Sequence, residues 1–128
     1  MMAKIYCSVL NVQSKTTIAT RIEVANSFFS RLRGLLGRKS LPAGDGLLIW
    51  PCSSIHCFGM HFPIDVVFLD RHARVISIRE NMIPGSHASQ RQARCVLELC
   101  AGEVKKYKIQ VGDQLLLSFT PSKDAVSE

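Results

Sequence analysis

The chain has 128 residues, of which 47% are hydrophobic and 20% charged, and its formal net charge is +6. This balance is typical of one globular domain and excludes a wholly disordered chain. The basic residues are scattered, and no helix-turn-helix or RNA-recognition signature occurs, so nucleic acid is not an expected partner.

Two strands are predicted at the start of the chain, over residues 4–10 and 16–24. In the second segment Ile18, Ile22 and Val24 fall on one face at a period of two residues, which is typical of a half-buried strand. The short polar link between the two segments favours a hairpin.

A helix is predicted next. Asn26, or the serine that follows it, can cap the first turn, and Phe28, Leu32 and Leu35 recur at helical spacing. Gly37 is a natural end for this helix.

The rest of the chain predicts short strands separated by polar segments. Residues 52–62 are expected to be irregular and residues 81–93 to form a long polar loop. The remaining predicted elements are strands over 47–50, 64–69, 74–78, 95–100 and 115–119, and a short helix over 101–108. Because strands and helices do not alternate regularly, a parallel doubly wound sheet is disfavoured.

The predicted fold is therefore mainly β (α+β): a small bent sheet or barrel of six or seven short strands with two short helices. We expect one globular domain over residues 1–119 and a flexible polar tail over residues 120–128.

Five cysteines are present, and an odd number in a chain of this size is not typical of a disulfide framework. No apolar run approaches the roughly 18 residues of a membrane span, and the apolar stretch at the start is too short for a signal peptide. We therefore expect a cytoplasmic protein without a membrane span.

Several short motifs follow one another in a fixed order: Arg33–Arg38, Leu41–Pro42, Gly46–Ile49, Ser54–His56, Gly59–Asp70, Val96–Leu99, Ala101–Gly102 and Val111–Asp113. Together they resemble the domain of unknown function 192 family of prokaryotes, over roughly residues 15–119. The resemblance implies a compact, mainly β fold. It implies no activity, cofactor or catalytic residue. Many relatives begin with an export signal or a lipoprotein anchor, and this sequence departs from that pattern.

Asp65 is a carboxylate within the apolar predicted strand 64–69, and Glu98 is placed similarly between Leu97 and Leu99. A buried carboxylate is costly unless it is paired or hydrogen-bonded. Asp65 can therefore be a ligand anchor or a base with a raised pKa, or it can hold the preceding loop through backbone N–H groups or pair with an arginine. Glu98 can be a second ligand contact, or it can be the solvent-facing residue of an alternating strand.

A second pattern is Cys52, His56, Cys57 and His61, whose side chains suit zinc or copper, with Met60 as an additional soft ligand. The paired knuckles of a structural zinc site are absent, so we predict no metal and no cofactor. Buried thiols beside a hydrogen-bonded histidine explain the same residues.

The function predicted from the sequence is a small binding or accessory module, with a ligand or partner site around residues 52–65. His56, Met60, Asp65 and Glu98 are the expected contacts. No catalytic residue is predicted. The alternative is a metal-binding or thiol-dependent enzyme that uses Cys52, His56, Cys57 and His61. A third possibility is a protein that docks partners on its basic face.

Overall fold

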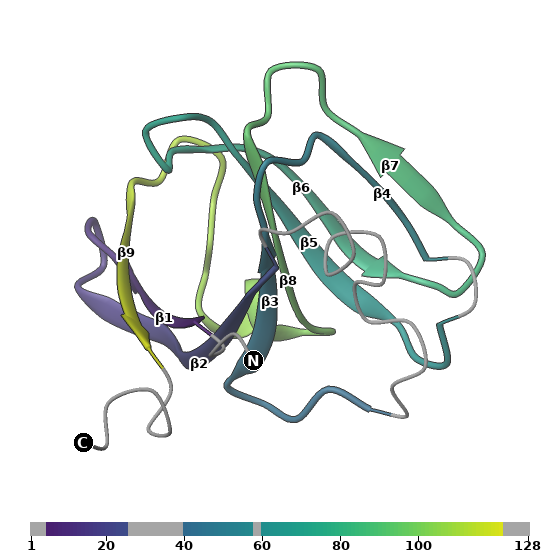
Figure 1. Ribbon diagram of the computed structural model, residues 1–128, viewed down its shortest axis with the longest axis horizontal. Coiled ribbons are helices and arrows are strands. Elements are labelled where there is room, and N and C mark those ends of the chain that lie inside the picture. The colour runs from purple at the N-terminus through teal and green to yellow at the C-terminus, as the bar shows by residue number, and fades with distance from the viewer. Residues whose placement is uncertain (1–4, 26–39, 58–59, 122–128) are drawn as a thin grey trace.

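The computed structural model describes residues 5–25, 40–57 and 60–121, and nearly all of these belong to short strands or the turns between them (Figure 1). The elements in chain order are β1 (Ile5–Asn11), β2 (Thr16–Ala25), β3 (Asp45–Ile49), β4 (Ser54–His56), β5 (Ile64–Leu69), β6 (Val75–Met82), β7 (His87–Ser89), β8 (Cys95–Cys100), α2 (Glu103–Lys106) and β9 (Leu115–Pro121). Seven strands form one sheet in the order β6-β5-β8-β3-β2-β1-β9, and β4 pairs with β7 separately.

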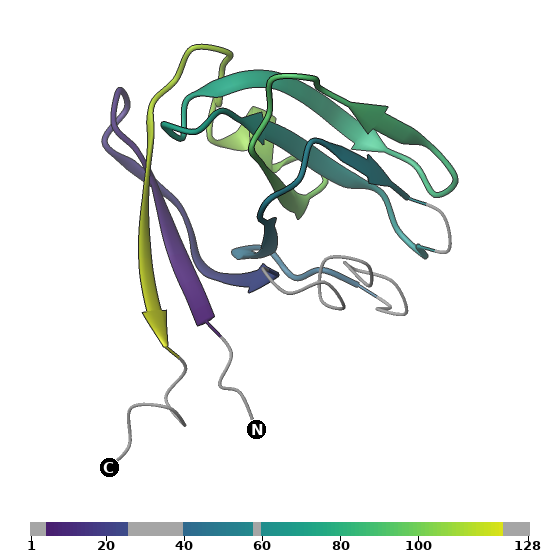
Figure 2. The same ribbon diagram turned by 45° about the horizontal axis from the view of Figure 1, so that its top comes forward.

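The large sheet curls into a half-barrel whose two edge strands meet at one end. Figure 2 shows β9 and the β5–β6 pair on opposite sides of the curl. An isolated bridge between Arg74 and Gln114 joins the two edges. The N–H of Leu115 donates to the carbonyl of Ala73 at 3.0 Å, and the N–H of Val75 donates to the carbonyl of Asp113 at 2.9 Å. The half-barrel is thus closed at one end by the turn between β5 and β6.

Two hydrophobic clusters cover the two faces of the sheet. The inner cluster joins residues that lie far apart in the strand order, such as Val9 of β1 and Val67 of β5. The outer cluster contains Phe68 of β5 and Ile55 of β4, so the paired strands β4 and β7 cover the outer face. All six residues of β5 are buried because its side chains alternate between these clusters.

The predicted mainly β bent sheet is confirmed, and the bounds predicted for β5 and β8 match the structure. The curled sheet has seven strands, within the predicted six or seven, and a separate two-stranded sheet brings the strands among the described residues to nine. The additional two are β4 and β7, which lie in segments expected to be irregular and whose pairing joins residues far apart in the chain. The strand β9 continues to Pro121, which places its end within the predicted tail.

The helix predicted over 101–108 is shorter than expected. The structure has α2 only from Glu103 to Lys106, because Gly102 before it and Lys108 after it both have positive φ angles, of 96° and 54°. The helix predicted after Asn26 lies outside the described residues. No helix in the described part of the chain is long and apolar enough to cross a membrane.

Candidate functional site

Asp65 is fully buried, and backbone N–H groups satisfy its carboxylate. The N–H of Asn81 donates to Oδ1 at 2.8 Å. The N–H groups of Gly102 and Val104 both donate to Oδ2 at 2.9 Å. One carboxylate therefore holds β5, the irregular end of β6 and the start of α2 together. Backbone N–H donors were an alternative that the sequence left open, but they were expected from the loop before β5, whereas they come from segments that follow it.

The local backbone explains why a carboxylate is needed at this position. The register of β5 against β6 shifts between Ile64 and Val66, so β6 carries a bulge. Asn81 lies in this bulge with a positive φ of 52°, and Gly102 has a φ of 96°. These bends leave N–H groups that no neighbouring strand accepts, and the carboxylate of Asp65 accepts them instead.

Glu98 and Met60 lie on the other face of the sheet from Asp65. In the register between β5 and β8, Asp65 is opposite Leu99 of the inner cluster, whereas Glu98 is opposite Val66 of the outer cluster. Met60 belongs to the outer cluster as well. The structure therefore brings Glu98 to the face covered by Met60, and it separates both from Asp65.

His56 is exposed on β4, where it is opposite His87 of β7, with the ring centroids 5.9 Å apart. It therefore lies on the solvent side of the β4–β7 pair, and Met60 is buried in the outer cluster that this pair covers. The four predicted contacts do not converge on one hollow of the described structure. Their role in binding stays a prediction.

The four residues of the cysteine and histidine pattern do not form a cluster. Cys57 is buried in the outer core, whereas His56 and His61 are exposed. The thiol of Cys52 donates to the carbonyl of Ser54 at 3.0 Å. Within residues 5–25, 40–57 and 60–121 no three His, Cys, Asp or Glu side chains are arranged to hold a metal ion.

The buried thiols are poorly suited to act as nucleophiles at neutral pH. Burial raises the pKa of the Cys57 thiol, although a hydrogen bond with Ser86 acts in the opposite direction. Burial also raises the pKa of Cys95 to about 12, and the neighbouring Cys52 and Asp70 add to this shift. A thiol must ionise before it attacks or binds a metal, so these environments favour structural cysteines.

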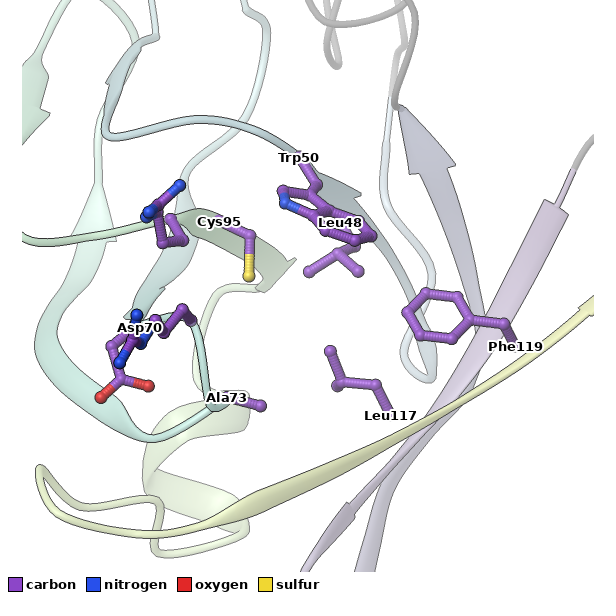
Figure 3. A pocket seen from close by; sticks show the side chains of 9 residues that line it. Leu48, Trp50, Asp70, Ala73, Cys95, Leu117 and Phe119 are labelled. Atoms are coloured by element: carbon purple, nitrogen blue, oxygen red, sulfur yellow. The ribbon is translucent and has the colours of Figure 1, made fainter.

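A hollow of about 300 Å³ lies instead at the open side of the half-barrel (Figure 3). One wall consists of Leu48 of β3 and Trp50, which follows it. The opposite wall consists of Leu117 and Phe119 of β9, whose side chains point toward the first wall in Figure 3. Trp50 is 51% exposed and Phe119 46% exposed, so large apolar surfaces face the hollow without being covered.

The charged groups of the hollow come from two turns. Asp70 and Arg71 lie in the turn between β5 and β6, and Arg94 precedes β8. The Oδ1 atom of Asp70 accepts the N–H groups of His72 at 2.8 Å and Arg74 at 3.0 Å. Burial acts to raise the pKa of Asp70, but these two hydrogen bonds outweigh it and lower the pKa below its usual value. Asp70 is thus an ionised part of its own turn.

The two arginines are the groups available to a ligand. Nε of Arg71 donates to Nε2 of His72 at 3.2 Å, and the part of the chain described here provides no carboxylate partner for either guanidinium. Volumes of a few hundred Å³ with apolar walls and a few charged groups are typical of small-ligand sites. The hollow can therefore hold an apolar body and pair its negative group with Arg71 and Arg94.

Comparison with known proteins agrees with the resemblance seen in the sequence. A family model, DUF192, described as an uncharacterized ACR, matches residues 9–117. This chain belongs to the DUF192 family. A UPF0127 protein from Thermococcus kodakarensis is 27% identical to it over 109 residues, which are 81% of this chain and 68% of that protein. Membership in DUF192 confirms the predicted family and assigns no reaction.

Two crystal structures share the fold of this DUF192 chain. One, from Sinorhizobium meliloti 1021, is described as a candidate transcription regulator and is 26% identical, with a TM-score of 0.78; it covers 90% of this chain and 94% of its own. The other, from Novosphingobium aromaticivorans DSM 12444, is a protein of unknown function. It is 21% identical, has a TM-score of 0.76, and covers 88% and 84% of the two chains. The second likeness shows the DUF192 fold alone.

Sequence reasoning missed most residues of the hollow in this DUF192 chain. The alternation of Leu115, Leu117 and Phe119 signals one buried face, yet three inward apolar residues predict a filled core and not an opening. Arg71 stood in a predicted turn, where nothing in the sequence distinguishes it from other surface arginines.

Proposed function

We propose that this chain is a binding module that holds an anionic, largely apolar ligand in the hollow between β3 and β9. The observation that supports the proposal most directly is the pairing of two apolar walls, which include the exposed side chains of Trp50 and Phe119, with the guanidinium groups of Arg71 and Arg94. We further propose that it works in the cytoplasm, which the absence of a disulfide among its five cysteines supports.

The charge of the hollow supports an anion over a neutral or cationic ligand. Arg71 and Arg94 contribute two positive charges, whereas the single carboxylate, Asp70, is engaged by its own turn. The formal net charge of +6 acts in the same direction by attracting anions toward the whole molecule.

The apolar walls support a ligand with a hydrophobic body. Trp50, Phe119 and the half-buried Leu117 offer an apolar surface that water covers when the hollow is empty. Burial of apolar surface contributes roughly 25 cal/mol per Å², and this contribution does not depend on the charge of the ligand. An amphipathic anion such as a fatty carboxylate combines burial of its apolar chain with pairing of its charge to the arginines.

Titration with octanoate tests the proposal, because Trp50 is the sole tryptophan of the chain and lines the hollow. Octanoate should shift Trp50 emission to shorter wavelength and saturate, while octan-1-ol should bind more weakly. We expect Arg71→Ala combined with Arg94→Ala to weaken octanoate binding roughly tenfold, equivalent to about 1.4 kcal/mol.

Arg91→Ala is the matched control, since Arg91 is also exposed and lies near Arg94 but does not line the hollow. It removes a positive charge without removing a proposed contact, and we expect the affinity for octanoate to stay within about twofold of wild type. A loss in Arg91→Ala as large as that in the combined Arg71→Ala and Arg94→Ala variant, or no response of Trp50 to octanoate, would overturn the proposal.

A further inference from the structure

We propose that the ligand of this hollow is an extended peptide segment that adds to the sheet as a strand along the open edge of β9. This inference rests on the proposed function, because it names the class of ligand that the same hollow takes. Three observations support it: the free backbone edge of β9, the side chains that the same residues send into the hollow, and the position of the two arginines.

The backbone of β9 offers hydrogen-bonding groups at the edge of the sheet. β9 is the last strand in the order, with β1 on its other side. The N–H of Leu115 points away from β1, since it donates to the carbonyl of Ala73 at 3.0 Å. Backbone groups alternate between the two edges of a strand with a period of two, so those of Leu117 and Phe119 face the same edge as those of Leu115.

Among residues 5–25, 40–57 and 60–121, partners for this edge occur only at its beginning. The carbonyl of Leu115 accepts Nε2 of Gln114 at 3.0 Å, and the bridge between Arg74 and Gln114 ends the contact with the opposite edge. Beyond it, no backbone partner for Leu117 or Phe119 on this edge occurs among the described residues. Open edges of this kind are the sites at which peptides add to sheets.

The same two residues line the hollow with their side chains. Leu117 and Phe119 are opposite Val9 and Cys7 of β1, which belong to the inner cluster, so their side chains point inward. Figure 3 shows both side chains directed toward Leu48 and Trp50 across the hollow. A strand that pairs with this edge would place alternate side chains in the same direction, into the hollow.

The charges of the hollow add a requirement for a carboxylate. Arg71 lies in the turn that meets the start of β9, and Arg94 lies on the far wall beside Cys95. A peptide on the edge of β9 could therefore present an acidic side chain or its terminal carboxylate to a guanidinium group. The inferred partner is an extended segment with alternating apolar residues and one carboxylate in reach of these arginines.

To test the inference, peptides that bind the purified protein are selected from a random display library, and the enriched peptides are then synthesised. Each should compete with octanoate for Trp50. Methylation of every second backbone nitrogen of the peptide should weaken binding about tenfold or more when the methylated nitrogens are those that face β9, because their N–H groups pair with β9. Methylation of the intervening nitrogens, which face away from β9, should have little effect. Amide hydrogen exchange of Leu117 and Phe119 should slow when the peptide binds and should stay fast with octanoate.

Three results would overturn the peptide assignment. The first is equal binding of the two sets of methylated peptides, and the second is amide exchange at Leu117 and Phe119 that does not change when peptide is added. The third is amide exchange at these residues that already slows with increasing protein concentration in the absence of peptide, which would indicate pairing between two copies of the chain. If Trp50 still responds to octanoate in these cases, the proposed function stands and only the peptide inference fails. If neither octanoate nor any peptide alters Trp50, both fail.

Discussion

At the scale of single residues, Asp65 shows how a buried charge can be stabilised without an ion pair. Its carboxylate accepts one N–H from the bulge of β6 and two from the start of α2. The cost of removing an isolated carboxylate from water is high, and hydrogen bonds from the backbone offset it. Such an arrangement fixes three elements relative to one another.

Replacement of Asp65 by alanine should therefore destabilise the fold strongly. Asp65→Ala leaves the N–H groups of Asn81, Gly102 and Val104 without an acceptor, and we expect the free energy of unfolding to fall by about 4 kcal/mol. Urea unfolding followed by circular dichroism measures this change. Glu80→Ala, at an exposed carboxylate on the same hairpin, should change it by less than about 0.5 kcal/mol. A loss in Asp65→Ala as small as that of the control would contradict the assigned role.

The sequence identified Asp65 as a buried carboxylate because of its apolar neighbours. It could not indicate which face of the sheet Asp65 shares with other polar residues, since that depends on the register between β5 and β8. Asp65 pairs with Leu99, whereas Glu98 pairs with Val66, so the side chains of Asp65 and Glu98 lie on opposite faces of the sheet. A binding set that combined Asp65 with Met60 and Glu98 therefore could not be checked from the sequence.

At the scale of elements, β3 depends on the absence of a side chain at Gly46. A Cβ atom at this position would lie 2.5 Å from the backbone oxygen of Glu98 in β8 and 2.6 Å from Cδ1 of Ile22 in β2. Both distances are far below van der Waals contact. Gly46 thus allows β3 to lie between two tightly spaced neighbours in the middle of the sheet.

Gly46→Ala should accordingly cost about 3 kcal/mol of unfolding free energy, because the clash involves backbone that cannot move without disturbing the sheet. Gly85→Ala is the informative comparison. Its φ is +91°, but an added Cβ would meet nothing within 4 Å, so only the backbone conformation is strained, at a cost of about 1 kcal/mol. Thermal unfolding of the two variants measures both effects, and a Gly46→Ala variant as stable as Gly85→Ala would refute the packing argument.

The strands that could be predicted are those with an unambiguous local pattern. Residues 64–69 and 95–100 are apolar apart from Asp65 and Glu98 and are bounded by turn residues, which is typical of strands buried on both faces. The strands β4 and β7 have only three residues each and contain serine and histidine. They exist because the two segments pair with each other over the outer cluster, and such long-range pairing leaves no period in the sequence.

At the scale of the whole molecule, the hollow is a consequence of incomplete closure. The turn between β5 and β6 contacts the start of β9 at Gln114, while the later part of β9 faces β3 across an open space. The walls come from β3, β8, β9 and two turns, so no contiguous stretch of sequence marks them. A mainly β bent sheet could be predicted from strand patterns. The opening depends on how closely the two edge strands of the curled sheet approach each other, which strand patterns do not indicate.

The central claim, that ligands enter this hollow, is tested most directly by nuclear magnetic resonance mapping of octanoate binding on isotopically labelled protein. The account predicts that the largest shifts occur at the indole N–H of Trp50 and at the amides of Ala73 and Leu117. It predicts little change at His56 or Met60. Shifts concentrated in residues 52–62, or spread evenly over the surface, would contradict it.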